Sequence, residues 1–234
     1  MKLLKTIAYG TCLMLISTVA FAQTQTMKGS NETSVEDIYL NSVQDVIITE
    51  LANSQDYDNK LVALQYLEDS VKSGKVSDEQ RAALKSLAGE GLTTRVRTNG
   101  RLMNNFPDIR AKACDLLGEI KTEESKNALI SVVTEDNEPM VVSAAIRSLG
   151  NIGINNSDEV LGAIEFIQHR YAALNPTSSL AYEVLDAYEK LAPTAQDRSA
   201  LIQSVAEIAS NYKFATPVRL KALNLLKKLQ SENR

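Results

Sequence analysis

The sequence is poor in the side chains that most metal and catalytic sites require. It holds one histidine, two cysteines and no tryptophan among 234 residues. The lone histidine, His169, has no cysteines or further histidines clustered near it in the sequence, as a zinc site would need. No G-x-S-x-G pattern marks a nucleophilic serine, and no run of alternating oxygen ligands around a glycine suggests a calcium loop. We therefore predict a non-enzymatic protein with no catalytic residue, no metal site and no cofactor.

Disulfides and general nucleic-acid binding are also disfavoured by composition. Cys12 lies in an N-terminal apolar stretch, which leaves Cys114 alone in the rest of the chain, and a lone cysteine forms no internal disulfide. Acidic residues number 29 against 25 basic ones. Nucleic-acid binding generally requires a basic face, so we expect no nucleic-acid partner.

Long apolar runs are missing apart from residues 7–19, which are too few to cross a membrane comfortably. Lys2 and Lys5 precede this run, and an A-x-A site ending at Ala22 follows it. This order is typical of a secretory signal peptide over residues 1–22, cleaved after Ala22. An uncleaved anchor helix and a lipid-modified Cys12 are the alternatives.

The leader predicts an exported protein, periplasmic or secreted, and its short length is typical of bacteria. Once it is removed, no remaining segment is expected to insert stably in a membrane. Residues 23–33 are polar and aperiodic, which predicts a flexible segment. We assign residues 34–234 to one folded domain.

From Ser34 onward, apolar residues recur with the period of an α-helix. We expect an all-α fold of about ten helices and no strand or hairpin. The expected ranges are 35–53 for an N-terminal capping helix, then the pairs 58–72 and 77–89, 107–120 and 123–134, 138–152 and 156–172, and 177–192 and 195–211, and a last helix at 216–231.

The helices contain an internal repeat. Residues 107–120 and 139–152 match position by position, and residues 109–117 match 218–226. Most first helices carry a small residue followed by an apolar one, with a larger apolar side chain three positions later. Small residues at fixed positions let neighbouring helices approach closely. A repeated helical unit of this kind predicts a solenoid of stacked helix pairs.

The repeated pattern resembles HEAT repeats. The resemblance lies in Pro-x-Ile/Val-Arg, then Ala, then Leu-Gly-x-Ile, which is clear in residues 107–120 and 139–152 and partial from Pro217 onward. It implies an armadillo-type α-α superhelix, that is, a solenoid whose usual role is to bind other proteins. It carries no catalytic residue to this chain, although a few HEAT-like proteins are lyases or glycosylases.

One insertion interrupts the repeat between Gly89 and Pro107. It brings Arg95, Arg97 and Arg101 together in an otherwise acidic protein. Insertions in solenoids form loops that often bind partners, and arginine suits carboxylate or phosphate ligands. We consider three forms: a docking loop for an acidic partner, a solvated loop without function, and a helix extension that packs Val96, Leu102 and Met103.

Four further side chains attract attention. Tyr182 is expected to be exposed, where tyrosine suits an interface, whereas Cys114 is expected to be buried and inert. His169 is expected to cap carbonyls near a helix C-terminus. Asp136 belongs to a group of carboxylates at turns, for which we expect a solvated polar rim.

These observations favour a scaffold that binds a protein partner in the cell envelope through Arg95, Arg97, Arg101 and Tyr182. The alternative is an accessory or structural subunit of a larger envelope complex or enzyme.

Overall fold

The computed structural model describes residues 34–93 and 95–231. The predicted signal peptide (1–22) and flexible segment (23–33) lie outside these residues. The chain divides into two compact units, residues 1–41 and 42–234. The described part of the first unit is the beginning of α2 (Val35–Asn53), a helix that ends in the second unit.

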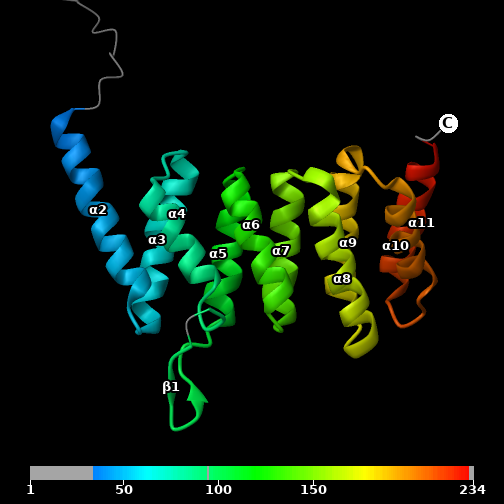
Figure 1. Cartoon of the computed structure of the whole chain (residues 1–234), viewed down its shortest axis with the longest axis horizontal. Helices are drawn as coiled ribbons and strands as arrows, with labels where there is room; N and C mark the ends of the chain where they lie inside the picture. Colours follow the sequence, from blue (N-terminus) through cyan, green and yellow to red (C-terminus); the bar gives the residue numbers. More distant parts are fainter. Residues whose placement is uncertain (1–33, 94, 232–234) are drawn as a thin grey trace, which may run out of the picture. The chain divides into compact units, whose positions relative to one another are not determined.

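The described residues of the second unit form helices packed in neighbouring pairs, and the predicted all-α solenoid fold is confirmed (Figure 1). The bounds lie within about three residues of the predicted ones. The helices are α3 (Tyr57–Ser73), α4 (Asp78–Ala88), α5 (Pro107–Glu119), α6 (Glu123–Glu135), α7 (Pro139–Ile152), α8 (Glu159–Leu174), α9 (Ser178–Leu191), α10 (Arg198–Ser210) and α11 (Thr216–Ser231).

Two short 3-10 helices, η1 (Asn156–Asp158) and η2 (Ala192–Thr194), precede α8 and α10. A small antiparallel pair, β1 (Arg97–Thr98) and β2 (Arg101–Leu102), lies between α4 and α5. The expectation of no hairpin was therefore wrong, because Asn99–Gly100 allows a tight turn that two-residue strands suffice to flank.

The helices of the second unit lie in two layers. In one layer α3, α5, α7, α9 and α11 pack side by side in that order. In the other, α4 packs beside α6 and α6 beside α8. Each second helix packs more extensively against the first helix of the following pair than against that of its own, as α4 does against α5 and α6 against α7, so successive pairs bury one another.

Local sequence sets where the helices begin. Pro107 and Pro139 are the first residues of α5 and α7, where a missing N–H breaks no helical hydrogen bond. The Ser77 hydroxyl accepts a hydrogen bond from the Gln80 N–H at 3.1 Å and caps α4, as its sequence predicts. Thr194 ends η2, and the Asp197 side chain caps α10 by accepting hydrogen bonds from the N–H groups of Ser199 and Ala200.

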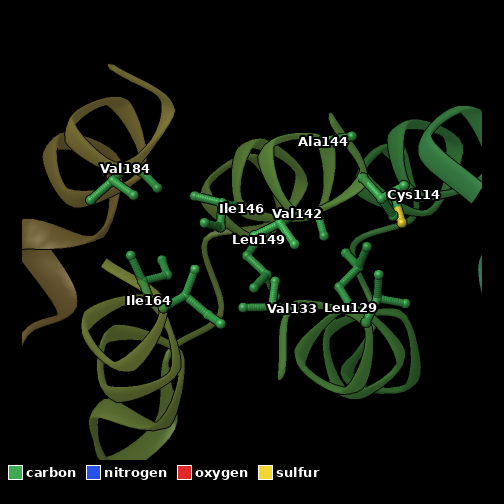
Figure 2. Close-up of a cluster of buried hydrophobic side chains, with 14 of the residues drawn as sticks. Cys114, Leu129, Val133, Val142, Ala144, Ile146, Leu149, Ile164 and Val184 are labelled. Atoms are coloured by element: carbon green, nitrogen blue, oxygen red, sulfur yellow. The ribbon is translucent and has the colours of Figure 1, made fainter. Parts of the chain in front are cut away.

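The core runs continuously through the pairs. Figure 2 shows Ile146 directed from α7 toward Val184 of α9 and Ile164 of α8, while Leu149 points toward Val133 of α6. All five side chains are fully buried. The equivalent of Ile146 in α11, Leu223, is 44% exposed, because α11 is the last helix that the structure describes and no further unit covers it there.

Two glycines allow the closest helix contacts. A Cβ on Gly118 of α5 would lie 2.6 Å from the Cβ of Ser148 in α7, and one on Gly150 of α7 would lie 3.0 Å from the Cα of Ala187 in α9. The Leu-Gly step of the repeat therefore places a residue without a side chain against a small residue of the next unit.

Candidate partner-binding surface

The insertion between α4 and α5 is a β-hairpin that extends past the ends of the neighbouring helices (Figure 1). Asn99 and Gly100 form its turn with φ of 51° and 80°. Positive φ at both central residues is the geometry of a type I′ turn, which Asn-Gly favours. The Met103 N–H donates to the Val96 carbonyl at 2.8 Å and extends the pairing. The helix-extension interpretation of this segment was therefore wrong.

The hairpin separates its arginines onto different faces. Arg97 is paired with Leu102, and Arg101 with Thr98. Cross-strand partners share a face of the ladder while successive residues alternate, so Arg97 and Arg101 point to opposite faces. Both are exposed, as is Arg95 just before the strand. The hairpin thus presents three guanidinium groups around one projection and does not gather them into a flat patch.

A buried polar network anchors the base of the hairpin. The Asn104 side chain accepts from the Val96 N–H at 2.9 Å and donates to Glu90 Oε1 at 2.6 Å. Glu90 Oε2 in turn lies 2.7 Å from the buried Lys60 Nζ. Gly91 has φ of 73°, and a Cβ there would lie 2.4 Å from the Asn104 carbonyl oxygen. These contacts fix the hairpin to α3 and to the end of α4.

Arg110 of α5 joins the same region to the next pair. Its Nε lies 2.7 Å from Asp136 Oδ2, and both side chains are almost fully buried. The guanidinium also donates to Asn105 Oδ1 at 2.9 Å and to the Glu90 carbonyl at 3.2 Å. The expectation that Asp136 lies on a solvated rim is wrong, because it is the counter-ion of a buried arginine.

Comparison with known proteins assigns the central pairs. Residues 100–174 match the family model for HEAT repeats. These residues are HEAT repeats. They span α5 to α8, the pairs in which the sequence repeat is strictest. No curated protein matches the chain.

The exposed surface of the first-helix layer carries ion pairs that link successive helix pairs. Glu68 of α3 lies 2.8 Å from Lys112 of α5, and Arg147 of α7 lies between Asp115 of α5 and Glu183 of α9, at 2.7 and 3.0 Å. These ion pairs use charged side chains of α3, α5, α7 and α9 within the first-helix layer.

Tyr182, the fourth predicted contact residue, lies apart from the hairpin. It is 45% exposed on α9, and the Lys221 ammonium of α11 lies 3.6 Å from its ring centroid. The two residues line a shallow hollow of about 510 Å³ between these helices, together with Leu220. Since α7 separates α5 from α9, and packed helix axes lie about 8–10 Å apart, the structure does not bring Tyr182 and the arginines into one site.

The surroundings of Cys114 and His169 show what these two remaining candidate residues do. Cys114 is fully buried, and burial raises the pKa of its thiol, so it is inert as expected. His169 caps no helix end. Its ring lies 3.6 Å from Glu165 of the same helix and 3.5 Å from Glu207 of α10.

In the part of the chain that the structure describes, no helix has the length and hydrophobicity to cross a lipid bilayer.

Proposed function

We propose that this protein is a non-enzymatic, exported HEAT-repeat scaffold that binds an acidic protein partner through Arg95, Arg97 and Arg101. HEAT repeats usually mediate protein–protein interaction, and the match over residues 100–174 supports that general role. The observation that carries the specific proposal is an anchored hairpin with three exposed guanidinium groups. None of the three has a carboxylate within ion-pair distance among the described residues.

The contrast with the helical arginines strengthens this assignment. Arg81 of α4, Arg110 and Arg147 all contact carboxylates within the fold. A guanidinium offers five hydrogen-bond donors and suits planar carboxylates. The hairpin therefore differs from these three helical arginines, because its guanidinium groups have no carboxylate within ion-pair distance among the described residues.

The same chemistry supports binding over catalysis. A guanidinium keeps its proton throughout the physiological pH range, so it serves poorly as a general acid or base. It holds an anionic group firmly and leaves it unchanged. The hairpin residues therefore suit recognition of a partner.

An accessory subunit of a larger envelope assembly is the second candidate. The hollow at Tyr182 favours it, because a second exposed contact surface on another pair would let one chain hold two components. Aromatic side chains beside an apolar residue such as Leu220 are typical of interfaces.

Site-specific photocrosslinking in the native cell tests the proposal. A photoreactive amino acid at Thr98, beside Arg101 on the hairpin, should yield a defined covalent adduct with a protein whose crosslinked segment is rich in Asp and Glu. The matched control is Lys121, which is exposed just after the far end of α5. Equal adducts from both positions, or none from Thr98, would remove the hairpin as the contact surface.

A further inference from the structure

A groove lies beside the hairpin in the second-helix layer. It runs between α4 and α6, has a volume of about 350 Å³, and the turn at residues 89–93 lines it as well. Ala128 and Val132, both buried, line it, and so does Leu92. Ala82, Ser86, Gly89 and Ser131 also line it. These small residues leave open a space that larger side chains would fill.

The chemistry of the groove is mainly apolar with a charged rim. Lys85 of α4 and Glu135 of α6 are both exposed there. A volume of this size is at the lower end of the range for ligand pockets, about 300–1,000 Å³. A whole helix would need a longer and wider channel, so the groove suits one or two apolar side chains.

Chain continuity connects the groove to the arginine hairpin. Leu92 and Thr93 line the groove, and Arg95 follows two residues later. A ligand side chain in the groove would therefore be attached to a backbone that passes the hairpin. Since the hairpin arginines have no carboxylate partners among the described residues, charge complementarity selects an acidic ligand.

We propose that the groove between α4 and α6 holds an apolar side chain of an acidic peptide segment whose carboxylates bind Arg95, Arg97 and Arg101. This inference rests on the proposed function and narrows it, because it makes the partner's contact a linear segment with an apolar anchor. The hairpin attracts the carboxylates of the peptide, and the groove selects peptides that carry an apolar side chain at the right position. Glu135 opposes acidic ligands and so limits their affinity.

Two synthetic peptides provide the probe. The first has one leucine between two blocks of four glutamates, and the second has glycine in place of the leucine. Each carries fluorescein and is titrated with the full folded chain by fluorescence anisotropy at low salt. Burial of the leucine should make the first peptide bind about tenfold more tightly or better.

Variants separate the groove from the hairpin. Ser131→Trp places a large ring in the groove and should abolish the preference for leucine while leaving the affinity for the glycine peptide unchanged. Thr134→Trp is the matched control, because Thr134 is exposed on the same helix and outside the groove lining. Its affinities should equal those of the wild type. Ala82→Trp fills the groove from α4 and replaces Ser131→Trp should that variant lose its helical circular dichroism.

Two more variants report on charge. Glu135→Gln should raise the affinity for both peptides a few-fold, because it removes a like charge at the rim. Replacing Arg95, Arg97 and Arg101 with serine should weaken the binding of both peptides by about the same factor.

The outcomes distinguish the two levels of the proposal. Equal affinity for the leucine and glycine peptides, with loss of both in the arginine variant, would overturn the groove assignment and leave the acidic partner intact. Affinities that do not change in the arginine variant, or no binding of either peptide, would overturn both.

Discussion

At the residue scale, charged side chains in this protein lie in two very different environments. Arg110 and Asp136 are buried against each other, whereas Glu189 and Lys228 form a pair on the surface with both side chains about half exposed. Water and salt weaken the surface pair, so the loss of one member costs little. A buried charge that loses its partner has neither water nor a counter-ion to stabilise it. The two pairs should therefore respond very differently to removal of one member.

Asp136→Ala should lower the free energy of unfolding by about 3–5 kcal/mol, because it leaves the Arg110 guanidinium buried and unpaired. Glu189→Ala should change it by less than about 1 kcal/mol. Urea denaturation of both variants, followed by circular dichroism, provides the comparison. Similar small losses in the two variants would show that the buried pair has no special role.

Glu68 should titrate at an unusually low pH. Hydrogen bonds from Lys112 and then Lys72 lower the pKa of this carboxyl to about 2. A depressed pKa means that the carboxylate stabilises the fold above the unfolded-state pKa, roughly 4.3, and that this contribution is lost as pH falls toward 2. Carbon-13 NMR of the Glu68 carboxyl should show the low midpoint, and Lys112→Met should move it upward. An ordinary midpoint in the wild type would contradict the pairing.

At the element scale, the sequence allowed the helices to be predicted but not the hairpin. Apolar periodicity, Pro107 and Pro139 located the helices because burial in a repeated stack requires one apolar stripe per helix. The hairpin strands have two residues each, too few to show alternation, and their only sequence indication was Asn99–Gly100. The burial of Asp136 was missed because its partner, Arg110, lies 26 residues earlier in the first helix of the same pair, and sequence alone does not reveal such pairing.

The two kinds of glycine should respond oppositely to alanine. Gly118→Ala should destabilise the fold by about 1–3 kcal/mol, because its Cβ would lie 2.6 Å from the Ser148 side chain and force α5 and α7 apart. Gly162→Ala in α8 should stabilise it by about 0.5–1 kcal/mol, since no atom lies within 4 Å of that Cβ and alanine favours helix. Thermal and urea unfolding measure both, and a stabilising Gly118→Ala would show that the helices are not closely packed there.

At the scale of the whole molecule, the repeat explains why the proposed binding hairpin lies outside the regular pattern. Each helix pair contacts its neighbours through the core, and ion pairs such as Asp115–Arg147 join successive pairs. The hairpin departs from this repeat, and we propose that a partner contacts it together with the groove between α4 and α6. Sequence spacing revealed the insertion, but the groove depends on side chains of α4 and α6 that only packing brings together.

The proposed export makes a prediction about the mature chain. Mass spectrometry of the protein purified from its native cell should give Gln23 as the first residue, because the A-x-A site ends at Ala22. Recovery from the periplasm or medium should accompany it. A chain that retains Lys2 and Lys5 would contradict export by a cleaved signal peptide.

The most direct test of the account is the affinity of the crosslinked partner for two purified proteins, the wild type and the variant with serine at positions 95, 97 and 101. The hairpin arginines are exposed and make no ion pairs among the described residues, so the variant should unfold at the same temperature as the wild type. Isothermal titration calorimetry should then show that the variant binds about ten- to a hundredfold more weakly, and the wild-type affinity should fall more steeply than that of the variant as salt rises. Equal affinities would contradict the claim that this protein binds its partner through the hairpin.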